Sequence, residues 1–563
     1  MATIVVRYDR LPVHRPRQNL TALAHQRLVV LLMLFGVVVS VLVLRLMWMG
    51  VAAGGEGMRV GGNANIPVRS DIVDRNGVAL ARTMDGYAIS VQPRKLISDP
   101  RELAVALHKI FPDDSEAHFY SLLTGNKWAY LRHRAMPEEV ARVNALGEVA
   151  IEFPREKERL YPQRTLAAHI LGFAPVDGKG GMGVEAAFDA RLTDPARRGT
   201  PLTLALDSRV QGALESELYA GLTSQSAHGA AGIVLDANTG EVIAMASLPV
   251  FDPNKLGKDA EARRNDMVQS RYELGSTFKP LSIAAAMDNG TVTSMSRRYD
   301  ATTPLQVGGF RIKDDHPLGR WLNVPETLVH SSNIVTARIA DEMGAAPLQK
   351  LYRALEFDRR PSIELHERAR PLWPSTWGRI TTMTVAYGHG IAVTPLHLAS
   401  AYAALVNGGI WRPATVLRLK ENQVPAGRRV FSAATSARMR QLLRMIAAEG
   451  TGRNANAPGY RVGGKTGSAE KPFEGGYAHR SLVTTFASAF PMDNPKYVVL
   501  VMMDEPQGSA EHPGARTAAW TAAPVVKRLV ERVGPMLGIL PDQRRDVDIS
   551  ELMPLLWKAP GEE

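Results

Sequence analysis

The sequence contains no cysteine among its 563 residues. Disulfides, thiolate zinc sites, iron–sulfur clusters and cysteine nucleophiles are therefore excluded. The absence suits an oxidising compartment, where a stray thiol would mispair. Aromatic residues make up only 6%, and no internal repeat or low-complexity tract interrupts the chain. The remaining composition, 45% hydrophobic and 22% charged, is that of a globular protein and excludes wholesale disorder or a polytopic membrane protein.

Negative charge is in deficit, because the formal net charge is +11. Part of this surplus lies in residues 1–27, where five arginines face a single acid, Asp9. The rest is dispersed and forms no basic run interleaved with aromatic residues, the pattern expected of a nucleic-acid surface. We therefore expect no binding to nucleic acid.

Long hydrophobic runs are also rare, and only one is long enough to cross a membrane. Leu28 to Leu44 carries no charge, and apolar residues continue past Arg45. A cleaved signal peptide and a buried core helix are the alternatives. We predict a cytoplasmic tail over 1–27, a transmembrane helix over 28–49 and a glycine-rich linker over 50–65. The arginines before the span place the N-terminus in the cytoplasm and the rest of the chain on the far side.

The first globular segment is predicted over residues 66–199. Asn76-Gly77 between apolar runs predicts a hairpin turn, and helices are expected near 100–125 and 136–147. Gly178, Gly180 and Gly183 match the dinucleotide-binding pattern G-x-G-x-x-G. The alternating strands and helices that such a site needs are missing around them, so a glycine turn before a helix is the preferred interpretation.

A second globular segment is predicted over residues 200–540, followed by a C-terminal tail over 541–563. Asp207 ends a strand and is placed to cap the next helix, and Asn238-Thr239-Gly240 predicts a hairpin within 230–247. Strands are expected again near the C-terminal end. Between them lie four helical stretches, expected over 276–290, 325–357, 378–408 and 433–449. This order predicts one sheet assembled from distant parts of the chain, with a helical lobe inserted.

Ser276 and Lys279 form an S-x-x-K motif at the predicted start of a helix. Pro280 then falls in the first turn, where its missing N–H breaks no helical bond. Residues three apart lie on one helical face, so the lysine is within reach of the serine. A lysine whose pKa is lowered by burial and neighbouring cations can take the serine proton. Alone, the motif is equally compatible with a capping serine and a surface lysine.

Two further motifs follow in order. Ser331-Ser332-Asn333 forms S-x-N and lies 55 residues after Ser276, and Lys465-Thr466-Gly467-Ser468 contains K-T-G and begins 134 residues later. No Ser-His-Asp order or G-x-S-x-G elbow competes, and His366-Glu367 lacks the second histidine of a zinc protease. The three ordered motifs indicate a serine acyltransferase.

The motifs resemble those of the penicillin-recognising serine enzymes, and the middle S-S-N is more like the membrane-anchored transpeptidases than class A β-lactamases. "IPVRSDIVDRNGVALA", "LYPQRTLAAHILGF", "GMGVEAAFD" and "YGHGIAVTPLHLASAYAALVNGG" resemble further stretches of class B penicillin-binding proteins, most closely the FtsI type. Ser70 stands where glycine is usual, His389 and His397 stand at glutamine positions, and Ser468 replaces a commoner threonine. The resemblance covers nearly everything after the membrane span.

The resemblance implies an α/β fold: a mixed α+β pedestal domain, then a transpeptidase domain whose sheet carries an inserted helical lobe. It also implies roles for residues. Ser276 is the nucleophile, Lys279 its base, Ser331 a proton relay, and Asn333 a group that orients Lys279 and the substrate amide. Lys465, Thr466 and Ser468 would bind the substrate carboxylate beside Gly467, and the backbone N–H groups of Ser276 and Ser468 would form the oxyanion hole.

The implied reaction is D,D-transpeptidation, which cross-links the D-Ala-D-Ala stem peptides of peptidoglycan through an acyl-enzyme, without metal or organic cofactor. β-Lactams would acylate the same serine. The FtsI type further implies a role in septal wall synthesis beside an FtsW-like membrane glycosyltransferase. An elongation enzyme, a D,D-carboxypeptidase and a silent β-lactam sensor remain as alternatives, whereas a bifunctional glycosyltransferase–transpeptidase would need a further catalytic domain for which the pedestal motifs leave no length.

Overall fold

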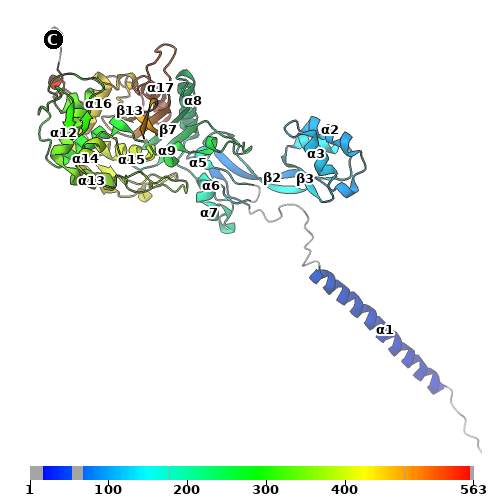
Figure 1. Cartoon of the computed structure of the whole chain (residues 1–563). Helices are drawn as coiled ribbons and strands as arrows, with labels where there is room; N and C mark the ends of the chain where they lie inside the picture. The colour runs from blue at the N-terminus through cyan, green and yellow to red at the C-terminus, as the bar shows by residue number, and fades with distance from the viewer. Residues whose placement is uncertain (1–16, 53–67, 176–177, 474–475, 558–563) are drawn as a thin grey trace, which may run out of the picture. The chain divides into compact units, whose positions relative to one another are not determined.

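The computed structural model describes residues 17–52, 68–175, 178–473 and 476–557 (Figure 1). The predicted linker over 50–65 falls almost entirely outside these residues. From residue 68 onward the chain forms two compact units. One consists of residues 87–156, and the other of residues 68–86 together with the described chain from 157 onward.

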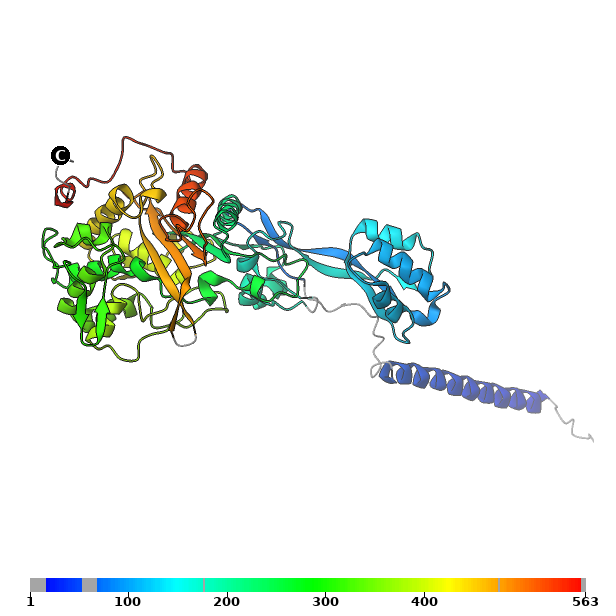
Figure 2. The ribbon, with the colours of Figure 1, turned by 45° about the horizontal axis from the view of Figure 1, so that its top comes forward.

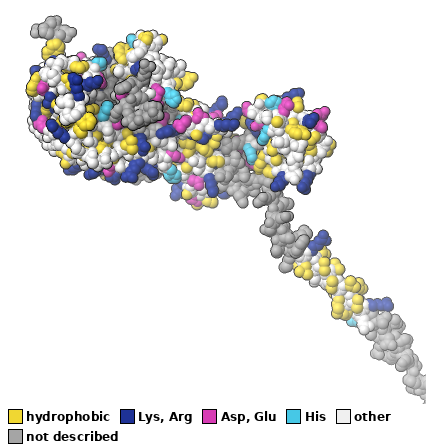
Figure 3. Space-filling model, viewed as in Figure 1, with side chains coloured by type: hydrophobic (Ala, Val, Ile, Leu, Met, Phe, Trp, Pro, Cys, Tyr) yellow, Lys and Arg dark blue, Asp and Glu magenta, His cyan; other side chains and the backbone are white. Residues whose placement is uncertain are grey.

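The N-terminal helix α1 spans Arg17–Ala52. Its apolar section, His25–Arg45, is long enough to cross a membrane and none of it is buried against protein. Figure 3 shows hydrophobic side chains along this part of the helix, with basic side chains towards its ends. An exposed helix whose side chains are apolar all round is unstable in water and stable in lipid. The predicted apolar helix is thus present and fits a membrane anchor, and it begins before the predicted start at residue 28.

The smaller unit, 87–156, packs three helices against a sheet around its own core, which includes Leu107 and Phe119. Asp99 and Ser115 cap the first two helices through their side chains, as short polar residues do at helix starts. The helix expected near 100–125 is therefore two helices. The elements are α2 Pro100–Ile110, α3 Glu116–Leu123, α4 Pro137–Asn144, β3 Ala129–Ala135, β4 Ile151–Glu152 and parts of β2 Ala79–Val91 and β5 Arg155–Leu160.

The larger unit begins with a small sheet. Its strand β1, Ile72–Val73, pairs antiparallel with β2 and parallel with β6, Leu202–Thr203. Gly77 sits in the connecting turn at φ +86°, a conformation that favours glycine, so the predicted Asn76-Gly77 hairpin is confirmed. Three short helices, α5 Ala168–Leu171, α6 Gly183–Ala187 and α7 Asp189–Thr193, complete this region.

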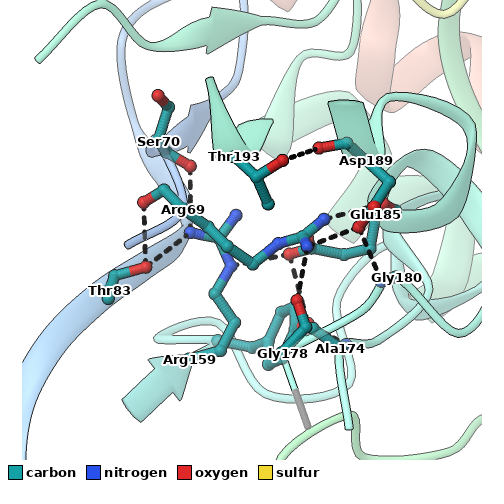
Figure 4. A network of polar contacts seen from close by, with 11 residues as sticks. Arg69, Ser70, Thr83, Arg159, Ala174, Gly178, Gly180, Glu185, Asp189 and Thr193 are labelled. Carbon is teal, nitrogen blue, oxygen red and sulfur yellow. Dashed lines mark hydrogen bonds and ion pairs between the residues drawn. The ribbon is translucent and has the colours of Figure 1, made fainter. Parts of the chain in front are cut away.

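A buried ionic network joins these parts (Figure 4). The Glu185 carboxylate accepts from Arg69 Nε at 2.8 Å and from Arg159 Nε at 2.7 Å, and Arg69 also reaches Asp189 and the Gly178 carbonyl. A Cβ on Gly180 would lie 2.1 Å from the Glu185 carbonyl oxygen. The glycines of the G-x-G-x-x-G stretch therefore allow close backbone packing around this network. The predicted glycine turn before a helix is present, since α6 begins at Gly183.

The main sheet has five antiparallel strands in the order β13-β14-β15-β7-β8. Strands β7 (Gly229–Asp236) and β8 (Val242–Leu248) form the predicted hairpin, while β13 (Gly463–Phe473), β14 (Gly476–Phe490) and β15 (Tyr497–Asp504) come from far along the chain. Figure 2 shows the orange strands between helix α17 (Ala522–Met536) and the green and yellow helices of the lobe. The predicted sheet with an inserted lobe is confirmed.

Both faces of this sheet are covered, which explains its unbroken apolar strands. On β15, Leu500 faces one core and Val501 the other, because successive side chains point to opposite faces. Helices α8 (Ser208–Ser224) and α17 cover one face, and Asp207 caps α8 as predicted. Helix α15, Pro395–Val406, lies against the other face.

The lobe contains the remaining helices and two small hairpins. The helical stretch expected over 325–357 is three helices, which are separated at Ser331, φ +62°, and at Gly344, φ +80°, because residues of positive φ end a right-handed helix. The elements are α9 Asp266–Gln269, α10 Lys279–Asp288, β9 Leu305–Val307, β10 Phe310–Ile312, α11 Val324–Val329, α12 Asn333–Met343, α13 Ala345–Ala354, α14 Arg379–Val385, β11 Ile410–Trp411, β12 Arg428–Arg429 and α16 Ala433–Glu449.

The described part of the C-terminal segment, 541–557, binds back onto this unit. Asp546 pairs with Arg444 at 2.6 Å. The Leu555 carbonyl accepts from Asn323 Nδ2 at 2.6 Å, and the Trp557 backbone N–H donates to Glu326 at 3.1 Å. Asn323 caps α11, so the end of the chain is fastened to the helix that directly precedes Ser331.

Candidate active site

Ser276 lies in a single turn of 3₁₀ helix, Gly275–Phe278, that runs directly into α10. The α-helix begins at Lys279, three residues later than predicted, and Pro280 lies in its first turn as expected. Ser276 is partly exposed, whereas Thr277 and Lys279 are fully buried. The Tyr402 hydroxyl donates to the Thr277 carbonyl at 2.9 Å and so stabilises the turn. The S-x-x-K motif thus presents a partly exposed hydroxyl and a fully buried amine from adjoining turns.

Strand β13 passes close beside this turn because two glycines allow it. A Cβ on Gly467 would lie 2.5 Å from the Leu274 carbonyl oxygen, closer than any real side chain tolerates. Gly275 has φ +52°, and a Cβ there would lie 3.0 Å from the Ser468 carbonyl oxygen. The backbones of the S-x-x-K and K-T-G motifs are therefore in near contact. The predicted oxyanion-hole donors, Ser276 and Ser468, belong to these two segments.

The two motif lysines meet at Ser331. Lys279 Nζ donates to the Ser331 carbonyl and, at 3.1 Å, to Ser331 Oγ. Lys465 Nζ donates to the same Oγ at 2.9 Å. Both lysines have no exposed surface. Two lysines from distant parts of the chain thus share the hydroxyl group of Ser331.

Burial dominates the electrostatics of this pair. It lowers the pKa of Lys279 to about 7, although the carboxylates of Asp314 and Asp315 act in the opposite direction. Burial likewise lowers the pKa of Lys465 well below its usual range, and the charge of Lys279 lowers it further. Desolvation disfavours the ammonium form, and so does a second cation nearby. At neutral pH the site therefore offers a lysine amine able to accept a proton.

The backbone at Ser331 is strained, since its φ of +62° lies in a region that β-carbon-bearing residues rarely adopt. The next helix stabilises it. Asp314 accepts from Ser332 Oγ at 2.8 Å and from the backbone N–H groups of Asn333 and Ile334 at 2.6 and 2.9 Å. Strained residues held by their surroundings gather at functional sites. Our sequence reasoning missed Asp314, whose one signal is its place in the acidic pair Asp314-Asp315.

Asn333 does not contact Lys279 in the way its predicted orienting role requires. Asn333 is the first residue of α12, and its Nδ2 donates to the Lys313 carbonyl at 3.0 Å. Within the described chain no hydrogen bond joins it to Lys279, whose Nζ is held by Ser331. That part of the prediction needs correction. The contact of its Oδ1 atom with a substrate amide stays a prediction.

The hydroxyls of the K-T-G segment have partners of their own. Thr466 Oγ1 donates to Thr451 Oγ1 at 2.9 Å, and Lys465 Nζ lies 3.3 Å from Thr466 Oγ1. Ser468 Oγ accepts from the Ala518 N–H at 3.1 Å, so its proton stays available for a ligand. Thr451 and Ala518 were not predicted, because no motif marks them.

His397 has a structural role. Its Nδ1 lies 2.9 Å from Thr394 Oγ1 at the start of α15, and its Nε2 lies 3.0 Å from the Arg359 carbonyl. Burial lowers its pKa to about 4, which keeps the ring neutral.

His389 follows Gly388, where a Cβ would lie 2.2 Å from the Gly275 carbonyl oxygen. This segment therefore supports the turn that carries Ser276.

Comparison with known families matches both globular parts of the chain. Residues 230–531 match the penicillin binding protein transpeptidase domain. Residues 64–193 match the penicillin-binding protein dimerisation domain. The three motifs therefore lie within the first of these matches.

Known relatives extend this result over most of the chain. It is 39% identical over 486 residues to the probable peptidoglycan D,D-transpeptidase FtsI of Caulobacter vibrioides, covering 84% of this chain and 82% of that protein. It is 29% identical over 521 residues to the peptidoglycan D,D-transpeptidase FtsI of Escherichia coli, covering 86% of each. A solved structure of penicillin binding protein 3 from Mycobacterium tuberculosis, complexed with aztreonam, matches with a TM-score of 0.67 at 25% identity, covering 84% of this chain and 97% of that one. The predicted resemblance is confirmed, and the chain belongs to the class B penicillin-binding proteins.

Proposed function

We propose that this protein is a peptidoglycan D,D-transpeptidase that works through an acyl-enzyme on Ser276. One observation carries the proposal. Lys279 and Lys465 both bond to Ser331 Oγ beside the turn that presents Ser276. A buried amine of lowered pKa, a relay hydroxyl and a second cation are what serine acyl transfer needs when no histidine is present.

Acylation begins when Ser276 Oγ attacks the carbonyl between the two D-alanines of a stem peptide. Its proton passes to the Lys279 amine, and the oxyanion is held by the backbone N–H groups of Ser276 and Ser468. The C–N bond then breaks, and the leaving nitrogen takes the proton from Lys279 through Ser331. Free D-alanine departs, and the donor peptide remains as an ester on Ser276.

Transfer reverses these proton movements. The amine of a neighbouring stem peptide attacks the ester carbonyl and gives its proton, through Ser331, to Lys279. The C–O bond breaks, Lys279 returns the proton to Ser276 Oγ, and an amide cross-link results. Lys465, Thr466 and Ser468 bind the terminal carboxylate of the donor, and Asn333 Oδ1 accepts from a donor amide. β-Lactams enter the same pathway and stop at the ester.

The anchor decides where the reaction takes place. Arginine residues precede the hydrophobic section of α1, which by the positive-inside rule leaves the N-terminus in the cytoplasm and residues beyond the span outside it. The FtsI relatives favour a role in septal wall synthesis over elongation. An FtsW-like glycosyltransferase in the same membrane would supply the strands to be cross-linked.

Covalent labelling tests the proposal. Intact-mass analysis of the full-length protein with a penicillin should give one adduct, which Ser276→Ala should abolish. Ser276 makes no capping bond to α10, whose N-cap is Phe278, so the variant should melt within a few degrees of the wild type. An adduct that persists in Ser276→Ala would show that another residue is the nucleophile.

A further inference from the structure

A pocket of about 380 Å³ lies in the helical lobe, and none of the predicted site residues lines it. We call it the arginine pocket. Its wall comes from the segment after α10, from Leu305 at the start of β9, from Trp321, from the second half of α12 and from α14. The lining residues are Arg297, Arg298, Tyr299, Asp300, Leu305, Trp321, Arg338, Asp341, Glu342, Arg379 and Met383. A volume of this size suits a sugar or a short peptide.

Ion pairs hold three of the four guanidinium groups in place. Arg297 pairs with Glu342 at 2.8 Å, Arg379 with Asp341 at 2.7 Å, and Arg338 with Asp300 at 3.6 Å.

The fourth arginine, Arg298, has no ion-pair partner within the described residues and is exposed. With four guanidiniums against three carboxylates, the wall has a net positive charge. A pocket of this kind favours an anion, and an arginine fork binds a carboxylate through two parallel hydrogen bonds.

Tyr299 supplies an independent indication of a ligand. The residue is only 6% exposed, yet within the described chain its hydroxyl has no hydrogen-bond partner. Its position is fixed, because its backbone exchanges hydrogen bonds with Leu322 at 2.8 and 3.0 Å. The Arg297 guanidinium lies over its ring at 4.9 Å. A buried hydroxyl normally has a partner, so this one indicates a polar group that enters the pocket.

The wall also offers an unsatisfied N–H and an apolar surface. Arg338 Nε is buried without a hydrogen-bond partner in the described chain. The Trp321 side chain is 53% exposed, although its neighbour in the chain, Leu322, is fully buried. The pocket thus combines cations, a hydroxyl, a buried donor and an aromatic face. A ligand that fits would carry a carboxylate, further polar groups and a small apolar part.

We propose that the arginine pocket binds a carboxylate-bearing stem peptide of peptidoglycan, at a site whose lining includes none of the proposed catalytic residues. The inference rests on the proposed function, since a wall cross-linking enzyme works among stem peptides. Such peptides carry free carboxylates, which suit the arginines. Their amide groups can bond to the Tyr299 hydroxyl, and the methyl groups of alanine suit the face of Trp321. A small free dicarboxylate shares the anionic part of this chemistry and lacks the amides and methyl groups.

The test uses full-length protein in detergent, first acylated completely with a penicillin so that the catalytic cleft is occupied. A purified disaccharide-tetrapeptide is then titrated into it by calorimetry, with glutarate titrated in parallel. We expect saturable binding of the muropeptide at one site and at least tenfold weaker binding of glutarate. Arg298→Ala should weaken muropeptide binding about tenfold and Tyr299→Phe about three- to tenfold. Arg360→Ala, an exposed arginine of the same lobe outside the pocket, should change nothing.

Tyr299→Phe has a second readout. Because its hydroxyl bonds to no other described group, its loss should leave the melting temperature of the ligand-free protein unchanged. Muropeptide binding that is absent, or unaffected by both pocket variants, would overturn the inference. Equal affinity for glutarate would overturn its wall-peptide part. A protein that the penicillin does not acylate would instead refute the proposed function, so the two failures are distinguishable.

Discussion

Lys279 and Lys465 donate to one hydroxyl, Ser331 Oγ, at 3.1 and 2.9 Å, although 186 residues separate them in the chain. Both are fully buried. Two ammonium groups so placed disfavour each other's charge, and the protons they lose belong to the pair as much as to either lysine. The arrangement makes two ordinary lysines into one coupled pair in which a neutral amine is available to accept a proton. The predictions on pH and on the lysine variants rest on this relationship.

The rate of acylation should depend on pH through Lys279. Its pKa is lowered to about 7, and the neutral amine, the form that accepts the serine proton, predominates above that pH. The second-order rate constant for acylation should therefore fall about tenfold per pH unit below 7 and level off above it. Measurement with a chromogenic cephalosporin between pH 5 and 9 checks this. A rate that keeps rising through pH 9 would place the base elsewhere or leave Lys279 unshifted.

Arginine substitutions should separate the roles of the two lysines. Lys279→Arg should be almost inert, because guanidinium stays protonated and cannot act as a base. Lys465→Arg keeps the charge and should retain more acylation than Lys465→Ala. Stopped-flow acylation rates give the comparison, and melting temperatures check that the variants fold. Equal rates for the two Lys465 variants would remove the electrostatic role proposed for that residue.

Ser331 combines a chemical and a conformational requirement, which two substitutions resolve. Ser331→Ala and Ser331→Gly both remove the hydroxyl, so acylation should fall by about 10²–10⁴-fold in each. Glycine adopts the observed φ of +62° without strain. Ser331→Gly should therefore be more stable than Ser331→Ala by about 1 kcal/mol, seen as a higher melting temperature. Wild-type rates in either variant would exclude the relay.

The residues of the site show which of its features the sequence predicts. The ordered motifs S-x-x-K, S-x-N and K-T-G, through the family resemblance they carry, predict that Lys279, Ser331 and Lys465 gather in one site, and the structure brings these three together. Asp314 and Thr451 support the site through hydrogen bonds to Asn333 and Thr466. The partners lie outside the motifs, so no sequence pattern predicts these bonds.

The errors in the fold have a similar cause. The sequence predicts a helical stretch over 325–357 and does not predict where it breaks. Tertiary contacts interrupt it at Ser331, where Asp314 caps the next helix. Asn333 was given a contact with Lys279 because the motif contains it, and the structure turns its amide towards Lys313. Motifs predict which residues gather, and long-range packing decides which atoms touch.

Gly467 should tolerate no side chain. In Gly467→Ala the new Cβ would lie 2.5 Å from the Leu274 carbonyl oxygen, so β13 must move away from the Ser276 turn. A displacement of about 1 Å at a reacting group costs roughly 100-fold in rate, and acylation should fall by about that factor. Gly378→Ala is the matched control, since a Cβ there meets nothing within 4 Å and its φ is −70°. Acylation at the wild-type rate in Gly467→Ala would mean that the two motifs are not held as closely as described.

The proposed role in division assigns a second task to α1 besides tethering. Gly36 and Ser40 lie four residues apart in the hydrophobic section, a spacing that lets two helices approach closely in lipid. If α1 packs against an FtsW-like partner there, exchanging residues 28–49 for an unrelated span should leave penicillin labelling intact and still fail to restore division. Depletion of the protein should give filaments with unfinished septa, scored by microscopy. Rounded cells would point to elongation instead, and full rescue by the foreign span would reduce α1 to a tether.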